Sequence, residues 1–247
     1  TGRIYLWQGG SLWIGQGPGR TRWPAHHAHQ LPPPPAGRFR FRTEKAGAWE
    51  DFEGAMVPSH CPHQFELDAI AVAHLFIEPE SRTGRALTGR FGTTSVARLQ
   101  TADSRAAAQS LFRQFAANAE REPMIDAALR AVTALCGALP EPARALDPRL
   151  VRALDYIRAH IRQALTLGEV AAAVALSESR FRHLFMAELG CSFRGYLLWL
   201  RINLAIEAVT AGASWTEAAH EAGFADSAHL TRTHKRVFGI EPSAIRP

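Results

Sequence analysis

Histidines are concentrated near the N-terminus of the 247-residue chain. Five of its eleven histidines lie between positions 26 and 63, namely His26, His27, His29, His60 and His63. His27 and His29 are two residues apart, so on a strand they would share one face. Imidazoles and the thiol of Cys61 are ligands that suit zinc, nickel or copper better than magnesium or calcium. The cluster therefore suggests a transition-metal site.

A second pattern with chemical meaning occurs twice in the C-terminal part of the chain. Residues 167–171 lead through Leu176 and Ser177 into residues 180–185, and residues 215–219 lead through Gly223 and Phe224 into residues 229–234. Each repeat has the pattern of a short helix, a tight turn and a longer helix. This is the layout of a helix-turn-helix unit, whose second helix enters the major groove of DNA.

The longer helices of the two repeats have similar polar faces. At about 100° per residue, Phe181, Leu184, Phe185 and Glu188 share one face of the first, and Leu230, His234 and Val237 share one face of the second. The opposite faces contain no acid, and their residues are Ser179, Arg182, His183 and Met186, then Ala228, Thr231, Arg232 and Lys235. Arginine can read guanine and serine or threonine can contact base edges or phosphates. A single such face could equally be a solvated surface, but two matching faces favour DNA binding.

The helix predicted over residues 192–211 joins the two repeats. Its 20 residues would span ~30 Å, close to the ~34 Å between successive major grooves on one side of B-DNA. One chain could therefore read two half-sites.

The elements that position these residues change character along the chain. Residues 1–101 contain short alternating runs such as residues 38–42, separated by glycines, and predict a small β-barrel or a jelly roll. Helices are predicted over 103–119 and 123–138, then over 148–162, 168–174, 177–189, 192–211, 215–222 and 226–238, with a short one near 242–246. Ile125, Leu129, Val132, Cys136 and Leu139 form a narrow apolar seam that would pack on the barrel or on a second copy of the chain.

Composition excludes several classes of protein. Apolar residues make up 47% and charged residues 21%, with 28 basic against 23 acidic residues and a net charge of +5. No segment has the pattern of a membrane span or a signal peptide. The three cysteines are too few for a disulfide framework, so we expect a cytoplasmic protein that does not bind membranes.

The C-terminal hundred residues resemble the AraC/XylS family of bacterial transcription regulators. The stretches that carry the resemblance are residues 223–242, with Arg246 beyond them, and Leu176 to Phe185 followed by Leu189 and Gly190. One departure is His234, which stands where the family usually has a buried phenylalanine. The resemblance implies base contacts from Ser179, Arg182, His183, Ser227, His229 and Arg232, and Arg180, Thr231 and Lys235 complete the predicted DNA-binding set.

The same resemblance implies a cupin-like N-terminal domain that binds an effector and forms a homodimer. Residues 76–81 resemble a stretch of such regulators, and residues 58–63 resemble the second cupin motif, with His60 in place of its usual glycine. In metal-binding cupins the matching ligands would be His27, His29 and His63, with Cys61 or His60 as a further donor. The glutamate that usually completes the set does not follow His29 at the expected distance.

Three interpretations of the N-terminal half remain open from the sequence. In the first, the pocket binds an organic effector without metal, between walls drawn from Trp7, Trp13, Trp23, Phe39, Phe41 and Phe65. In the second, zinc, nickel or copper occupies the histidine site. In the third, the histidines lie on the surface and have no role.

The sequence thus predicts an α+β protein that regulates transcription. Its predicted parts are an effector-binding domain (1–101), a helical dimerisation segment (102–139), a linker (140–147) and a double helix-turn-helix domain (148–247). Promoter DNA, RNA polymerase and a small effector or metal are the expected partners. The alternatives are a metal-dependent cupin enzyme and a DNA-repair methyl acceptor, but no catalytic constellation or reactive cysteine supports either.

Overall fold

The computed structural model describes residues 2–15, 19–33, 37–69, 71–99, 102–142 and 144–242. The chain divides into two compact units, one of residues 1–143 with 235–247 and the other of residues 144–234. The short helix predicted near 242–246 falls almost entirely outside the described residues.

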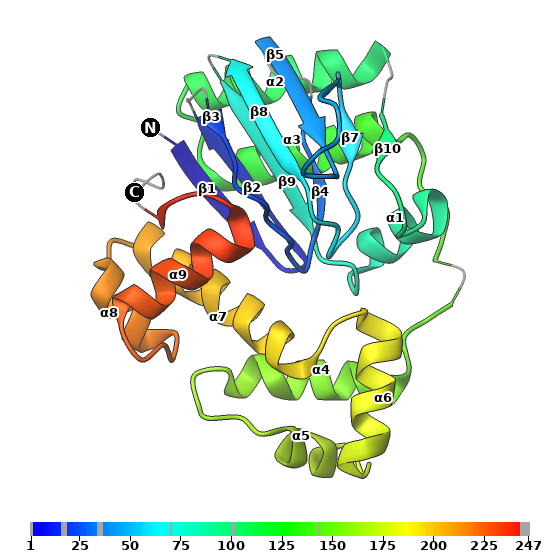
Figure 1. Ribbon diagram of the computed structural model, residues 1–247, viewed down its shortest axis with the longest axis vertical. Helices are drawn as coiled ribbons and strands as arrows, with labels where there is room; N and C mark the ends of the chain where they lie inside the picture. The colour runs from blue at the N-terminus through cyan, green and yellow to red at the C-terminus, as the bar shows by residue number, and fades with distance from the viewer. Residues whose placement is uncertain are drawn as a thin grey trace. The chain divides into compact units, whose positions relative to one another are not determined.

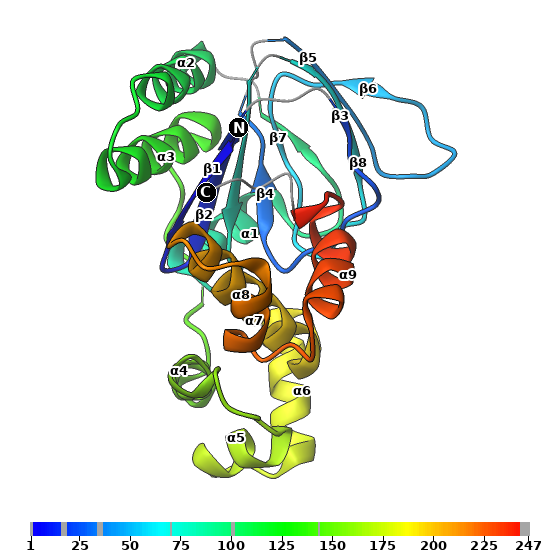
Figure 2. The same ribbon diagram turned by 90° about the vertical axis from the view of Figure 1, so that its left-hand side faces the viewer.

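Two four-stranded antiparallel sheets build the first unit in the described part of the chain, and Figure 2 shows them face to face. One sheet has the order β1 (Gly2–Trp7), β2 (Gly10–Gly15), β9 (Val72–Ile77), β4 (His29–Leu31). The other has the order β3 (Gly19–Arg20), β8 (Gln64–Ala69), β5 (Gly37–Arg42), β6 (Glu50–Asp51), and a short ladder joins β7 (Ala55–Met56) to β10 (Ala97–Arg98). The predicted β-rich N-terminal half is therefore confirmed.

Helices α2 (Ala102–Ala116) and α3 (Arg121–Cys136) cover the first of these sheets, as Figures 1 and 2 show. Ile125, Val132 and Cys136 are buried in a core that they share with residues of β1, β2 and β9. Leu129 differs from them, because 40% of its surface is exposed. The predicted seam therefore packs mainly on the sheet of its own unit.

Helix α1 (Arg82–Phe91) was not expected in a segment predicted to contain only strands and turns. Ser81 begins it by accepting a hydrogen bond from the backbone N–H of Gly84, at 2.9 Å. A Cβ at position 84 would collide with the backbone of Glu78 and Pro79. Gly84 thus permits a close approach of helix and chain, and the prediction of strands and turns alone was wrong here.

Six helices follow in the described part of the chain, and their ends agree with the predicted ranges to within two residues. They are α4 (Pro148–His160), α5 (Leu167–Ala173), α6 (Glu178–Leu189), α7 (Phe193–Thr210), α8 (Trp215–Glu221) and α9 (Ser227–Phe238), with α9 beginning in the second unit. None of the helices in the described ranges is long and apolar enough to cross a membrane.

Local signals in the sequence account for these helix ends. Ser214 and Glu217 form the predicted capping box of α8, and Thr166 and Glu169 form another on α5. Such reciprocal bonds satisfy amide groups that the first turn leaves without partners. Gly190 ends α6 in the left-handed conformation, with φ of 67°, which glycine adopts without a steric penalty.

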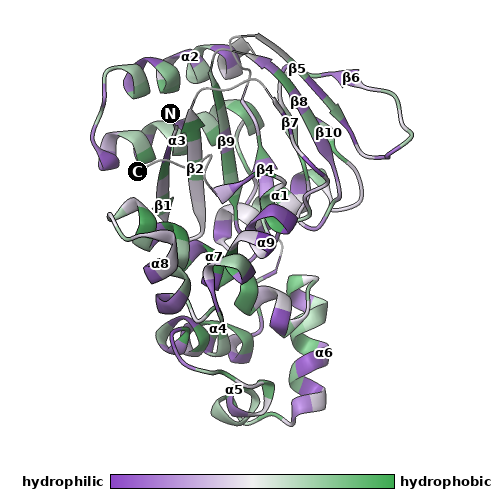
Figure 3. Ribbon diagram, turned by 60° about the vertical axis from the view of Figure 1, so that its left-hand side comes forward, coloured by the Kyte–Doolittle hydropathy of each residue, from purple (hydrophilic) through white to green (hydrophobic). Residues whose placement is uncertain are grey.

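The central strand of the first sheet and helix α6 differ in hydropathy. Figure 3 shows β9 mainly in hydrophobic colour at the centre of its sheet, and α6 in mixed colours. A helix with one apolar side anchors that side in a core and leaves the other available for contacts. This is the arrangement that the predicted recognition helices need.

Candidate nucleic-acid interface and histidine cluster

Helix α6 has one side buried in a core and the opposite side exposed. Phe181, Phe185 and Leu189 are buried in a core formed with α4, α5 and α7. The two phenylalanine rings meet edge to face, with centroids 5.5 Å apart. The predicted DNA-binding residues lie on the opposite side and are exposed, namely Ser179, Arg180, Arg182 and His183. The predicted division of this helix into two faces is confirmed.

Helix α9 shows this division only in part, because Val237 of the predicted inner face is half-buried. Leu230 and His234 are buried, Arg232 is exposed, and Ser227, His229, Thr231 and Lys235 are half-buried. The ring of His234 meets the edge of Trp215, with centroids 6.1 Å apart, so an imidazole does fill this interior position. The His229 ring packs on Phe224 at 5.2 Å. Lys235 is ion-paired to Glu241, with Nζ and Oε1 2.6 Å apart.

The arginines of these helices differ from those elsewhere in the chain. Within the part of the chain that the structure describes, Arg180, Arg182 and Arg232 form no ion pair or hydrogen bond through their guanidinium groups. By contrast, Arg149 is paired with Asp147 and Arg162 with Glu221. Three free, fully charged guanidiniums on exposed helix faces can bind phosphates or the edges of bases.

Helix α7 joins the two helix-turn-helix units. It has 18 residues and therefore spans ~27 Å, slightly less than the length predicted from residues 192–211. Its buried face, which includes Tyr196, Trp199 and Ile202, runs along the helix. We therefore expect α7 to act as a rigid spacer between the units.

The histidines predicted to bind metal face different partners in the first unit. His29 lies 2.9 Å from Thr88 Oγ1 through Nε2, and His63 lies 2.8 Å from the Cys61 carbonyl through Nδ1. In the described ranges, the group of potential ligands whose donor atoms lie within 4.8 Å of one another includes His27 and His60, but neither His29 nor His63. The structure does not bring His27, His29 and His63 together, and Cys61 Sγ instead donates to the Pro62 carbonyl. Metal binding by that set stays a prediction.

A side-chain amide lies among three other imidazoles. Gln30 Oε1 is 2.8 Å from His26 Nε2 and 3.0 Å from His63 Nε2, and Gln30 Nε2 is 2.9 Å from His74 Nδ1. Desolvation lowers the pKa of His26 to about 4, that of His63 to about 3 and that of His74 to about 4. The three rings are therefore neutral at pH 7.

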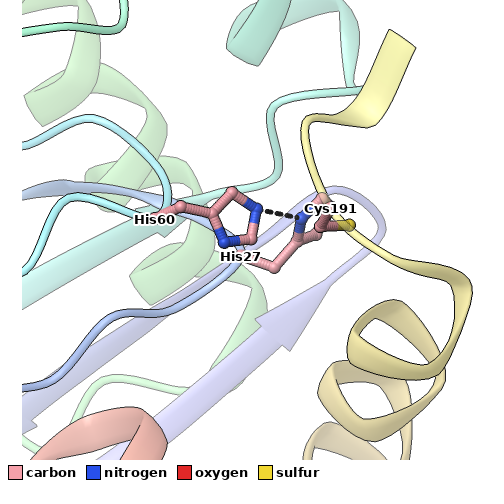
Figure 4. A group of neighbouring side chains, drawn as sticks. All are labelled: His27, His60 and Cys191. Atoms are coloured by element: carbon pink, nitrogen blue, oxygen red, sulfur yellow. Dashed lines mark hydrogen bonds between the residues drawn. The ribbon is translucent and has the colours of Figure 1, made fainter. Parts of the chain in front are cut away.

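Glu80, His27 and His60 form a separate chain of contacts. His27 Nε2 lies 2.9 Å from the Glu80 carboxylate, and both side chains are 2% exposed. His27 Nδ1 lies 3.1 Å from His60 Nε2, and Figure 4 shows the two rings with these nitrogens facing each other. His60 has a φ of 62°, a left-handed conformation that costs a residue with a Cβ about 1–2 kcal/mol.

The aromatic residues predicted to form the effector pocket are only partly together. Phe39, Phe41 and Phe65 are buried in one cluster, whereas Trp7 packs on the core beneath α3. The Trp23 ring lies beside the Arg42 guanidinium. Trp13 and Phe65 line a cavity of about 40 Å³, together with His26 and His74. Two of the predicted wall residues thus border an actual cavity, and it is small.

Comparisons with known proteins match the C-terminal region. A helix-turn-helix domain family matches residues 170–247. The transcriptional regulator YidL of Escherichia coli is 31% identical over 103 residues, which are 40% of this chain and 35% of that protein. A protein of Streptomyces antibioticus named as an AraC-like transcription regulator is 31% identical over 40% of this chain and 33% of its own length. Residues 170–247 are thus similar to the helix-turn-helix domains of transcription regulators, including one named as AraC-like.

The fold of the whole chain matches a solved structure of the same general architecture. The crystal structure of ToxT from Vibrio cholerae aligns over 98% of this chain and 96% of its own, with a TM-score of 0.61 and 10% identity. This likeness shows the fold and confirms the predicted combination of an N-terminal β-rich part with a helical C-terminal part. The chain covers only about a third of the length of the curated relatives.

Sequence reasoning found the two longer helices of the helix-turn-helix repeats but missed three residues of the histidine cluster, His74, Gln30 and Glu80. Gln30 and Glu80 contact these rings from positions that match no motif spacing. Glu80 lies in the segment 76–81 that was singled out by resemblance, yet it is 53 positions from His27. The expected glutamate was sought near His29, whereas the fold supplies a carboxylate from the turn after β9.

The lowered pKa values of the neutral histidines predict acid sensitivity of the first unit. These rings bind protons less readily in the folded chain than in the unfolded chain, whose histidines titrate near pH 6.5. The free energy of unfolding should therefore fall as the pH decreases from about 6.5 towards 4, and these rings should have no effect above that range. Urea unfolding at pH 7.5, 5.5 and 4.5 in EDTA measures this. His74→Asn, which removes one titrating ring, should reduce the slope, and an unchanged slope would contradict the assignment.

Proposed function

We propose that the protein is a transcription regulator that binds promoter DNA through α6 and α9 and responds to a small effector in its N-terminal unit. The observation that carries the proposal is the pair of recognition helices, each anchored on one side and exposing uncompensated arginines on the other. Arg180 and Arg182 would contact the DNA in one half-site, and Arg232 would contact it in the other. The match of residues 170–247 to a helix-turn-helix domain family favours this role over a metal-dependent enzyme.

The partners beyond DNA follow from the family and from particular features. ToxT, which shares the fold, has been crystallised with an unsaturated fatty acid, and this supports an organic effector for the present chain. We propose that such an effector first binds at the cavity beside Trp13 and Phe65. Leu129, exposed on α3, is a candidate contact in a homodimer. We also propose that the protein acts in the cytoplasm and that RNA polymerase is a further partner.

Selection of DNA from a random pool by the full-length chain tests the DNA-binding part of the proposal. We expect recovered sequences to share two short motifs separated by about one helical turn, 10–10.5 base pairs. The double variant Arg182→Ala/Arg232→Ala, which leaves both apolar anchors intact, is the matched control and should recover no motif. Recovery of unrelated sequences by the wild-type chain would contradict the proposal.

The effector part needs a separate experiment. Small organic acids and neutral aromatic compounds are screened for an increase in the thermal unfolding temperature, because a ligand that binds only the folded state stabilises it. A hit is then tested for a change in DNA affinity. We expect Phe65→Ala, which alters the cavity wall, to lose the thermal shift; retention of the full shift would place the effector elsewhere.

A further inference from the structure

The hydrogen bond between His27 and His60 brings two imidazole nitrogens to nearly the separation that they would have on one metal ion. In tetrahedral zinc sites each imidazole nitrogen lies about 2.0–2.1 Å from the metal, which places two such nitrogens about 3.3 Å apart. His27 Nδ1 and His60 Nε2 are 3.1 Å apart. These two atoms could contact a shared ion once the rings turn so that both lone pairs point to it and His60 carries its proton on Nδ1.

Glu80 supplies the group that commonly orients a metal-bound histidine. Its Oε2 atom lies 2.9 Å from His27 Nε2, so Nε2–H donates to the carboxylate and the lone pair of His27 is on Nδ1, facing His60. A carboxylate behind the ligating imidazole fixes its tautomer and raises its basicity in metal sites. The carboxylate also adds a negative charge beside the position of a cation.

His60 reaches this position at a conformational cost. Its backbone is left-handed, with φ of 62°, a conformation that is uncommon for residues other than glycine. Strained backbone that is retained commonly marks a functional site. His60 is also half-buried, whereas His27 is buried, so an ion can approach from the side of His60.

We infer that His27 Nδ1 and His60 Nε2, with Glu80 behind His27, form a binding site for a divalent transition-metal ion of the zinc, nickel or copper type. Imidazole ligands suit these metals, and hard cations such as magnesium prefer oxygen. Water or donor atoms of an effector would occupy the remaining coordination positions. This assignment replaces His29 and His63 by His60 and is independent of the proposed DNA binding.

Calorimetric titration of untagged full-length chain with zinc, after removal of metals by a chelator, tests the site. We expect one zinc ion per chain and no binding of magnesium. His60→Gly should lose zinc binding while the chain unfolds at a higher temperature, because glycine accepts the left-handed backbone without strain. Glu80→Gln should weaken zinc binding by about 10–100-fold.

Matched variants make the result decisive. His60→Asn tolerates the same backbone and should also lose zinc binding, which separates the loss of the imidazole from any effect peculiar to glycine. His29→Gln and His63→Gln remove the histidines of the sequence-based set and should retain zinc binding. Undiminished zinc binding by folded His60→Gly or His60→Asn, or loss of binding only in the His29 or His63 variants, would overturn the inference.

Discussion

Replacing Arg182 or Arg232 by alanine should lower the affinity for the selected DNA site by about 1–3 kcal/mol each, or roughly 5- to 150-fold. Each guanidinium is exposed on a helix whose other side is anchored, and each has no ion-pair partner among the described residues. Neither side chain contributes to the core, so both variants should keep the stability of the wild-type chain. Because the two residues lie in different helix-turn-helix units, we expect the two losses to be nearly additive.

The two variants should also differ in the base positions that they affect. A guanidinium that reads a base contributes to sequence preference, whereas one that contacts phosphate weakens binding to all sequences alike. Titrations against the selected site and against sites with one altered base pair distinguish these roles. We expect Arg182→Ala to relax preference in one half-site and Arg232→Ala in the other. Equal weakening on all sequences would show that the arginines contact only the DNA backbone.

Phe185→Ala should cost about 3–5 kcal/mol of stability in the second unit, because it removes a fully buried aromatic ring. The ring is 1% exposed and contacts Phe181, Phe193 and Tyr196, with centroids 5.5–5.8 Å apart. The cost is comparable to the whole stability of many small domains. The second unit should therefore unfold at a much lower denaturant concentration, and DNA affinity should fall with it.

Denaturant unfolding followed by far-ultraviolet circular dichroism measures this loss, since the second unit is almost wholly helical. Met186→Ala is the matched control, because Met186 is the next residue on the same helix and is 48% exposed. That variant should change stability by less than about 0.5 kcal/mol. Similar effects of the two substitutions would contradict the division of α6 into a buried and an exposed face.

The helical half of the chain was predictable because its signals are local. Repeating apolar positions such as Phe181 and Phe185, a capping box at Ser214 and Glu217, and helix-ending glycines all act within one or two turns. These signals gave helix ends within two residues and the exposed face of α6. The departure at His234 was visible in the sequence, and its burial followed from the same periodicity.

The N-terminal site was less predictable because its contacts join distant parts of the chain. The partners of His27 are His60 and Glu80, 33 and 53 positions away, and no periodicity encodes such pairings. The apparent motif spacing of His27, His29 and His63 suggested one ligand set, whereas the fold directs the three rings to different partners. Helix α1 was missed for a related reason, since the role of Gly84 depends on the nearby chain at Glu78.

Hydroxyl-radical footprinting on the selected sequence tests whether one chain places two recognition helices on one DNA site. We expect two protected segments about 10 base pairs apart on one side of the duplex. Arg182→Ala should weaken protection of one segment, and Arg232→Ala should weaken protection of the other. A single protected segment that both variants affect equally would show that the two helices do not bind separate half-sites.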